Sequence, residues 1–392
     1  MDKRVFKLTE VIVVVIITAV LSAIVTGFVS YNALVNFKKV SYVNLTNDKD
    51  LQEFIEVYAE LVTDYYKDVD RKELLDSAIT AMTTYLDEKY TMRLSKEDAT
   101  TLFDSLSGQY QGVGIEILPD RSINTVFENS PAAEAGIQKG DIIIKVNNED
   151  VTDYESSEVA ALIKSNKNGD KVSITVKRSG KEKTFEVKLS NVNIPSVYSS
   201  IEDGTHIGYI YINAFNNNTY FQFREKLEEL EKKNITSLII DVRSNGGGYL
   251  ISAKQIASLF IEQGKVIYSL ADKNAKIEYK DETKESRSYP IVVLINGNSA
   301  SASEILTAAL IDSYGATTVG KTSFGKGKVQ QTKELNDGST LKYTSANWLR
   351  PNGECIDEVG IKPDYEVDVV LQDGKVIDAQ YNKAVEILKK AK

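Results

Sequence analysis

The chain contains few of the residues from which metal centres and the commonest catalytic triads are built. It has one cysteine, Cys355, and one histidine, His206, in 392 residues. A single cysteine excludes an intrachain disulfide and a thiolate metal cluster. A single histidine excludes a multi-histidine zinc site and argues against a Ser-His-Asp triad. A hydrolase built on this chain must take its general base from another residue type, and we expect no metal and no other cofactor.

The chain also lacks a surplus of positive charge. Its 47 Lys and Arg residues are outnumbered by 56 Asp and Glu residues, which gives a net charge of −9. No long basic run offsets this balance, so a nucleic-acid partner is not expected. The length and a hydrophobic content of 42% predict two or three folded units with ample core-forming capacity.

Charge is absent from one stretch near the N-terminus. Val11 to Val29 forms an uncharged run of 19 residues behind the basic MDKRVFK, about the length needed to cross a bilayer. A cleavable signal peptide has a shorter apolar region and a small-residue cleavage site, which is not evident here. We therefore predict a cytoplasmic n-region and transmembrane anchor over residues 1–35. Lys3, Arg4 and Lys7 place the rest of this single-pass protein on the outer side of the cell membrane.

Residues 36–107 are predicted to be helical. LQEFIEVYAELVTDYY and RKELLDSAITAMTTYL repeat apolar residues at three- and four-residue steps. Asp70 is a candidate N-cap of the second helix. No catalytic or binding motif is evident in this region. We expect its helices to serve in packing, as a linker or in dimerisation.

Residues 108–192 are predicted to form short strands and two helices. Three stretches, GVGI, SPAAEAG and KGDII, together resemble a PDZ domain of the bacterial protease-associated type. Such a domain adds an extended peptide to a sheet edge and holds its terminal carboxylate on backbone amides. The resemblance implies that the carboxylate loop is Gly112, Val113, Gly114 and Ile115, and that the second helix, with Val159 and Ile163, borders the peptide groove.

Residues 193–366 alternate strands and helices, which predicts a mixed α/β unit, and residues 367–392 are predicted to be a helical tail. The segment GATTVGKT, from Gly315 to Thr322, matches the phosphate-loop pattern of nucleotide hydrolases. That loop requires a strand before Gly315 and a helix beginning at Lys321. The sequence has a helical pattern before it and a glycine-rich stretch after it, so no nucleotide is expected.

A serine with a lysine base is an alternative chemistry that needs no histidine. Burial can lower the pKa of a lysine until its neutral form accepts a proton from a serine hydroxyl. SASASE follows the strand PIVVLI at a helix start, and TSFGKGKVQ could bring a lysine close to it. From these residues alone, a helix-capping serine and a solvated loop lysine remain an open explanation.

Together with DVRSNGGG, GYIYINAF and the closing GIKPD, these stretches resemble the carboxy-terminal processing peptidases, also called tail-specific proteases. The resemblance runs over about residues 50 to 390 and implies a ClpP/crotonase-like protease core. It places the nucleophile at Ser301, the general base at Lys326 and a lysine-orienting glutamine at Gln330. It also implies an oxyanion hole made by the backbone N–H groups of Ala302 and Gly247.

The chain departs from the family pattern at two places. Gly246 stands where proline is common, and Lys164 or Ser165 stands near the place of an arginine that the family uses between its PDZ and protease domains. The sequence thus predicts a membrane-anchored, extracytoplasmic serine endopeptidase that binds unstructured protein C-termini, expected to be a homodimer. The alternative is a PDZ scaffold with an inactive protease-like core.

Overall fold

The computed structural model describes residues 48–372 and 375–391, and it divides the chain into two compact units at Tyr85 and Leu86. In the first unit, the predicted helices form as α2 (Lys49–Thr63) and α3 (Arg71–Tyr85). Asp70 caps α3 as expected, because its Oδ1 accepts from the N–H groups of Lys72 and Glu73 at 2.8 and 3.0 Å. No side chain of either helix is fully buried.

The predicted membrane anchor, Val11 to Val29, lies outside the described residues. Among the residues that the structure does describe, every helix is too short or too polar to span a bilayer.

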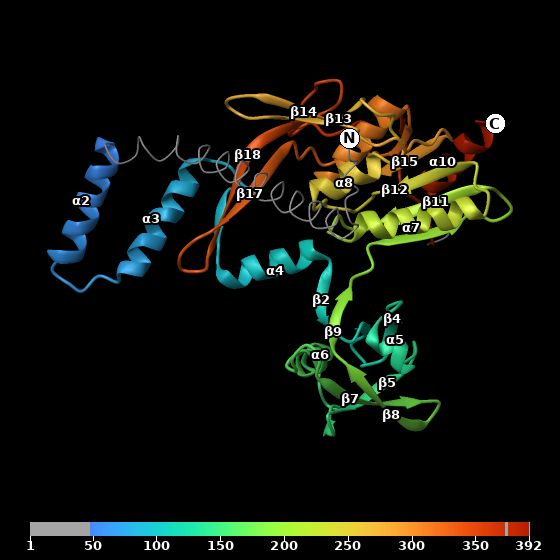
Figure 1. Cartoon of the computed structure of the whole chain (residues 1–392), viewed down its shortest axis with the longest axis horizontal. Helices are drawn as coiled ribbons and strands as arrows, with labels where there is room; N and C mark the ends of the chain where they lie inside the picture. The colour runs from blue at the N-terminus through green and yellow to red at the C-terminus, as the bar shows by residue number, and fades with distance from the viewer. Residues whose placement is uncertain (1–47, 373–374, 392) are drawn as a thin grey trace, which may run out of the picture. The chain divides into compact units, whose positions relative to one another are not determined.

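In the second unit, the segment predicted as a PDZ domain has its own hydrophobic core. Its largest sheet is antiparallel and has the order β6-β5-β7-β8, and two short antiparallel pairs, β2–β9 and β3–β4, accompany it. These elements run from cyan through green to yellow-green in Figure 1. They are β2 (Gln109–Gly112), β3 (Ile115–Ile117), β4 (Ile123–Val126), α5 (Pro131–Ala135), β5 (Ile142–Val146), β6 (Glu149–Asp150), α6 (Ser156–Lys164), β7 (Lys171–Arg178), β8 (Lys181–Lys188) and β9 (Ser190–Asn193).

A six-stranded sheet of order β10-β11-β12-β15-β16-β19 forms the centre of the predicted α/β part. Strand β10 is antiparallel to β11, and the remaining neighbours are parallel. The strands are β10 (Val197–Ile201), β11 (Ile207–Ile212), β12 (Ser237–Asp241), β15 (Ile291–Ile295), β16 (Thr317–Gly320) and β19 (Tyr365–Glu366).

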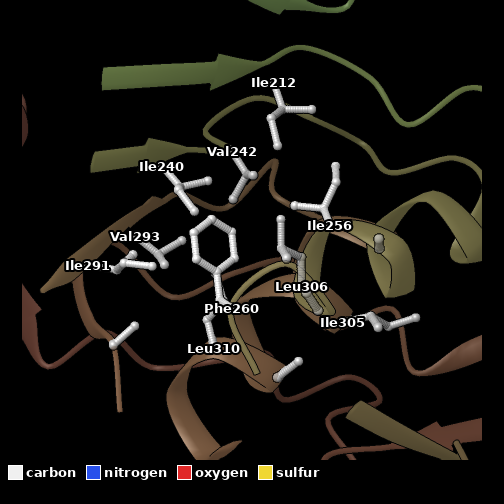
Figure 2. Close-up of a cluster of buried hydrophobic side chains, with 14 of the residues drawn as sticks. Ile212, Ile240, Val242, Ile256, Phe260, Ile291, Val293, Ile305, Leu306 and Leu310 are labelled. Carbon is white, nitrogen blue, oxygen red and sulfur yellow. The ribbon is translucent and has the colours of Figure 1, made fainter. Parts of the chain in front are cut away.

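Helices cover both faces of this sheet, so its central strands are apolar without interruption. Leu238 and Ile240 of β12 pack on one face, and Ile239 between them packs on the other. Figure 2 shows Phe260 on the first face, enclosed by side chains that include Ile240 and Leu306. The first face carries α7 (Thr219–Lys232), α8 (Leu250–Ala257) and α9 (Ala302–Ala309), and the second carries α10 (Ala379–Lys390), which forms within the predicted C-terminal tail.

A second sheet has the order β1-β18-β13-β14, with β17 also paired to β18, and β17 begins two residues after Lys326. The hairpin predicted about Asp337 and Gly338 joins β17 to β18, and Gly338 has a φ of 82° that suits glycine in such a turn. Figure 1 shows this hairpin in orange and red. The strands are β1 (Met92–Leu94), β13 (Val266–Ala271), β14 (Lys276–Lys280), β17 (Lys328–Glu334) and β18 (Thr340–Leu349).

Candidate active site

Ser301 lies where the chain leaves strand β15 and enters helix α9, as the N-cap residue of that helix. Its backbone angles, φ 56° and ψ −114°, are ones that a residue with a side chain rarely adopts. Strain of this kind persists only where surrounding contacts impose it, and it is typical of functional turns. The side chain is half-exposed and sits at the N-terminal end of the helix, where unpaired N–H groups favour developing negative charge.

The two neighbouring serines of SASASE are used for structure. Ser299 is fully buried and donates to the Val242 carbonyl at 2.8 Å. Ser303 is fully buried in α9 and donates to the Asn245 carbonyl at 2.8 Å. Ser301 is therefore the one serine of the three that remains accessible to a substrate.

Lys326 is half-buried in the irregular loop between β16 and β17. The Trp348 indole N–H donates to the Lys326 carbonyl at 2.8 Å, and this bond holds the loop backbone in place. The Lys326 Nζ lies 4.7 Å from the centre of the Tyr90 ring. Burial lowers the pKa of Lys326, and the nearby Lys342 ammonium lowers it further, whereas Glu88 and Glu304 act in the opposite direction. The pKa moves in the direction that a lysine general base requires.

Glu304 connects the Ser301 turn with the Lys326 loop. Its Oε2 accepts from the N–H groups of Ser301 and Lys326 at 2.8 and 2.9 Å. Its Oε1 accepts from the Ser323 hydroxyl at 2.6 Å and from the Gly325 N–H at 2.7 Å. The side chain is only 1% exposed, and burial raises its pKa although these four donors oppose the rise.

Glu304 is the last residue of SASASE, and no role was predicted for it. The signal was present, because a serine followed three residues later by glutamate is the pattern of a helix capping box. That pattern predicts the bond to the Ser301 N–H. It does not predict the contacts with Ser323, Gly325 and Lys326, which depend on the fold.

The two predicted oxyanion donors lie beside Ser301. A Cβ atom on Gly247 would come within 2.7 Å of the Ala300 carbonyl oxygen and 2.8 Å of the Ser301 Cβ, so Gly247 packs directly on the turn that contains Ser301. No hydrogen bond of the described residues uses the Ala302 N–H, at the start of α9. The Gly247 N–H donates to Asn245 Oδ1 at 2.9 Å, and it can serve an oxyanion only by exchanging that partner.

Gln330 lies near the lysine loop, but its side chain is directed elsewhere. Its Nε2 donates to the Thr344 hydroxyl at 3.4 Å, and that hydroxyl donates to Glu88 Oε2 at 2.8 Å. Gln330 lies on β17, the strand that begins just after Lys326. Among the described residues, no hydrogen bond joins the side chains of Gln330 and Lys326.

The DVRSNGGG turn is held by ion pairs. Arg243 contacts Asp241 at 2.6 Å and Asp378, the N-cap residue of α10, at 2.7 Å. These bonds raise the pKa of Arg243 against the effect of its burial. Asn245 in the same turn is fully buried, and its side-chain nitrogen donates to the Ile212 carbonyl at 2.9 Å. The turn is thus anchored on the N-terminal side of Gly247.

The phosphate-loop pattern does not form a phosphate loop. Gly315 terminates the helical segment before it, and Thr317 to Gly320 form strand β16 of the central sheet. Lys321 then pairs with Glu366 at 3.1 Å and Asp368 at 2.6 Å.

Comparisons with known proteins agree with this geometry. Peptidase family S41 matches residues 206–367, and the PDZ domain family matches residues 106–189. The carboxy-terminal processing protease CtpA of Bacillus subtilis (strain 168) is 36% identical over 361 residues, which is 91% of this chain and 76% of that protein. The chain belongs to peptidase family S41. It is a serine protease of the carboxy-terminal processing type with a PDZ domain.

Other relatives of this S41 peptidase point the same way. A probable CtpA-like serine protease of Staphylococcus aureus (strain COL) is 34% identical over 90% of this chain and 71% of that protein. Among solved structures, a photosystem II D1 C-terminal processing protease has a TM-score of 0.50 and 27% identity, covering 81% of this chain and 86% of that one.

The PDZ domain of this S41 peptidase holds its predicted loop residues in a tight turn. Gly112, Val113 and Gly114 are buried, and Gly114 has a φ of 85° with Ser130 so close that a Cβ atom would lie 2.2 Å from it. Val159 and Ile163 were predicted to border the groove. The structure instead buries both in the domain core at 0% and 3% exposure, where they support α6 from inside.

Proposed function

We propose that this S41 peptidase cleaves proteins with a Ser301–Lys326 dyad assisted by Gln330. The observation that carries the proposal is the shared carboxylate of Glu304, which holds the backbones of Ser301 and Lys326 together. Of the three serines in SASASE, Ser301 alone is accessible, and burial lowers the pKa of Lys326.

In the proposed reaction, neutral Lys326 accepts the proton of the Ser301 hydroxyl, and the oxygen attacks the peptide carbonyl carbon. The tetrahedral oxyanion binds the N–H of Ala302, and also that of Gly247 once it leaves Asn245. Collapse of this intermediate breaks the C–N bond, and Lys326 returns the proton to the leaving amine. Water, deprotonated in turn by Lys326, then hydrolyses the ester on Ser301.

Gln330 is proposed to orient the lysine after a change of partner. Its present acceptor, Thr344 Oγ1, is 3.4 Å away, which is a long contact and a weak one. Rotation of the Gln330 side chain towards Lys326 would replace that weak bond by one to the amine that does the chemistry.

The PDZ domain is proposed to bind unstructured C-terminal tails of substrates. Strand β3 pairs only with β4 among the described residues, so its other edge is open for an added peptide strand. The tight Gly112–Ile115 turn at the start of that edge is suited to hold the terminal carboxylate on backbone N–H groups.

We also propose a membrane anchor formed by residues 1–35, a catalytic portion outside the cell membrane, and a homodimer. For the dimer, α2 exposes a stripe of apolar side chains that includes Phe54 at 43%, Ile55 at 54% and Leu61 at 39%. A second copy can cover this stripe. Light scattering on the chain without residues 1–35 tests this, and a monomeric mass would contradict it. The anchor predicts that the full chain stays with membranes after an alkaline wash.

The proteolytic proposal is tested with an unfolded tailed substrate supplied in two forms, one with a free C-terminal carboxylate and one amidated. Wild type is expected to cleave the free form faster, and Ser301→Ala is expected to cleave neither. Equal slow cleavage by both enzymes would reject Ser301 as nucleophile. Equal rates on both substrates with wild type would reject recognition of the carboxylate by the PDZ domain.

A further inference from the structure

The side chain of Tyr110 lies on the loop that is proposed to bind the substrate carboxylate. Tyr110 belongs to β2, two residues before the loop begins. A Cβ atom on Gly112 would meet Tyr110 Cε2 at 2.3 Å and Cδ2 at 2.9 Å, so the ring is in direct contact with the first residue of the loop.

Two further side chains hold the ring in this place. Phe127 meets it edge-on, with ring centres 6.4 Å apart and planes at 89°. The Lys164 Nζ of helix α6 lies 5.5 Å from the centre of the ring, within the range of a cation–π contact. Tyr110 is half-buried as a result, although its strand is short and pairs only with β9 among the described residues.

The Tyr110 ring lies against the first residue of the loop whose N–H groups a peptide would need. The Phe127 N–H donates to the Gly114 carbonyl at 2.9 Å, so Ile115 and its partner Val126 form a non-hydrogen-bonded pair. The Ile115 N–H therefore points away from β4, towards the open edge. Burial raises the pKa of the Tyr110 hydroxyl, and the backbone N–H groups of Gly114 and Ile115 oppose that rise as hydrogen-bond donors to it.

We propose that Tyr110 is an internal stopper of the PDZ carboxylate loop, which a substrate tail must displace in order to bind. This inference rests on the proposed function of the PDZ domain as a receptor for C-termini. It adds that Tyr110 occupies the loop when no substrate is bound, and that a tail must displace Tyr110 before it can bind.

Replacement of the Tyr110 hydroxyl by a peptide group at the loop N–H groups favours a terminal carboxylate over other parts of a protein chain. A carboxylate accepts hydrogen bonds about twice as strongly as a neutral hydroxyl does, so it can compete with Tyr110 for the same N–H groups. An internal loop offers only neutral carbonyl groups and gains little from the exchange. The stopper therefore makes the domain select free C-termini, at the cost of weaker overall binding, since the apparent affinity is reduced by the fraction of time the loop is closed.

The experiment measures binding by fluorescence anisotropy of a short labelled peptide that ends in an apolar residue, in free-carboxylate and amidated forms. The protein is the full chain carrying Ser301→Ala, so that the peptide is bound and not cleaved. Tyr110→Ala is expected to bind the free-carboxylate peptide about tenfold more tightly. Tyr110→Phe keeps the ring and removes the hydroxyl, and we expect a smaller gain of about threefold.

Tyr154→Phe is the matched control, because it removes a tyrosine hydroxyl of the same domain that contacts Glu149 instead of the loop. The affinity of this variant for the free-carboxylate peptide is expected to stay unchanged. Unchanged or weaker binding by Tyr110→Phe would overturn the stopper, and weaker binding would make the hydroxyl a ligand contact. This reading holds even if Tyr110→Ala does not fold. Equal affinity of the unmutated loop for free and amidated peptides would instead reject the proposed carboxylate recognition, independently of Tyr110.

Discussion

The backbone N–H groups of Ser301 and Lys326 donate to the same carboxylate oxygen, Oε2 of Glu304. The two nitrogen atoms are thus separated by no more than two hydrogen-bond lengths, although 24 positions of sequence that include strand β16 lie between these residues. A shift of either loop must break a bond to this buried carboxylate. Glu304 therefore holds the backbones of the proposed nucleophile and the proposed base close together, which is the role of a positioning residue.

Glu304→Gln is expected to lower kcat/KM by roughly tenfold or more while the protein remains folded. The amide nitrogen of glutamine would face N–H or O–H donors on one side of the carboxyl position, and at least one of the two loops must move. Steady-state kinetics measures the effect. Glu225→Gln, a surface change on α7, is the matched control, and equal activity of the two variants would remove Glu304 from this role.

The pH dependence of kcat/KM is expected to report Lys326. The general base must be neutral, so activity falls as pH decreases through its lowered pKa. Lys342→Gln removes a positive charge that lowers this pKa, and the acid limb should move to higher pH. Glu88→Gln removes a negative charge that raises it, and the limb should move to lower pH.

At a fixed pH on the acid limb, these opposite shifts correspond to roughly threefold lower activity for Lys342→Gln and roughly threefold higher activity for Glu88→Gln. Simple damage to the fold would lower both activities. Shifts in the same direction for the two variants would show that another group sets the acid limb.

The turn that bears Gly247 offers a comparison between two adjacent glycines. Gly247 has a φ of 101°, and a Cβ atom there would contact Ala300 and Ser301, whereas a Cβ atom on Gly246 would meet nothing within 4 Å. Gly247→Ala is expected to lower kcat by roughly a hundredfold, as for loss of an oxyanion donor. Gly246→Ala should stay within about twofold of wild type. Similar rates for the two variants would place the oxyanion elsewhere.

The sequence predicted the elements of the site better than the contacts within it. Apolar alternation and capping residues predicted the strands, helices and the β17–β18 hairpin, because these depend on local patterns. These local patterns could not tell which of Ser299, Ser301 and Ser303 is accessible to a substrate, since all three suit a helix start. The difference in accessibility depends on Val242 and Asn245, which are far away in sequence. Their carbonyls accept hydrogen bonds from the hydroxyls of Ser299 and Ser303, respectively.

Other features of the site depend on tertiary packing in the same way. The prediction placed Val159 and Ile163 at the groove from family resemblance, but the side of α6 that faces the core is fixed by the sheet beneath it. Tyr110 and Gly112 lie two residues apart on β2 and so share one face of the strand, but the place of the Tyr110 ring on that face depends on Phe127 and Lys164, which are distant in sequence. By contrast, the neighbouring sequence was enough to predict that GATTVGKT is not a phosphate loop, and the structure confirms this, because Thr317–Gly320 form strand β16.

Substitution of Ser301 and of Lys326 tests whether these two residues form the catalytic pair. The most direct measurement is the turnover of an unfolded substrate with a free C-terminus by wild type, Ser301→Ala, Lys326→Ala and Gln330→Ala under identical conditions. We expect measurable turnover by wild type, none above background for Ser301→Ala and Lys326→Ala, and a reduced rate for Gln330→Ala. Turnover by Ser301→Ala or Lys326→Ala at the wild-type rate would contradict this catalytic pair.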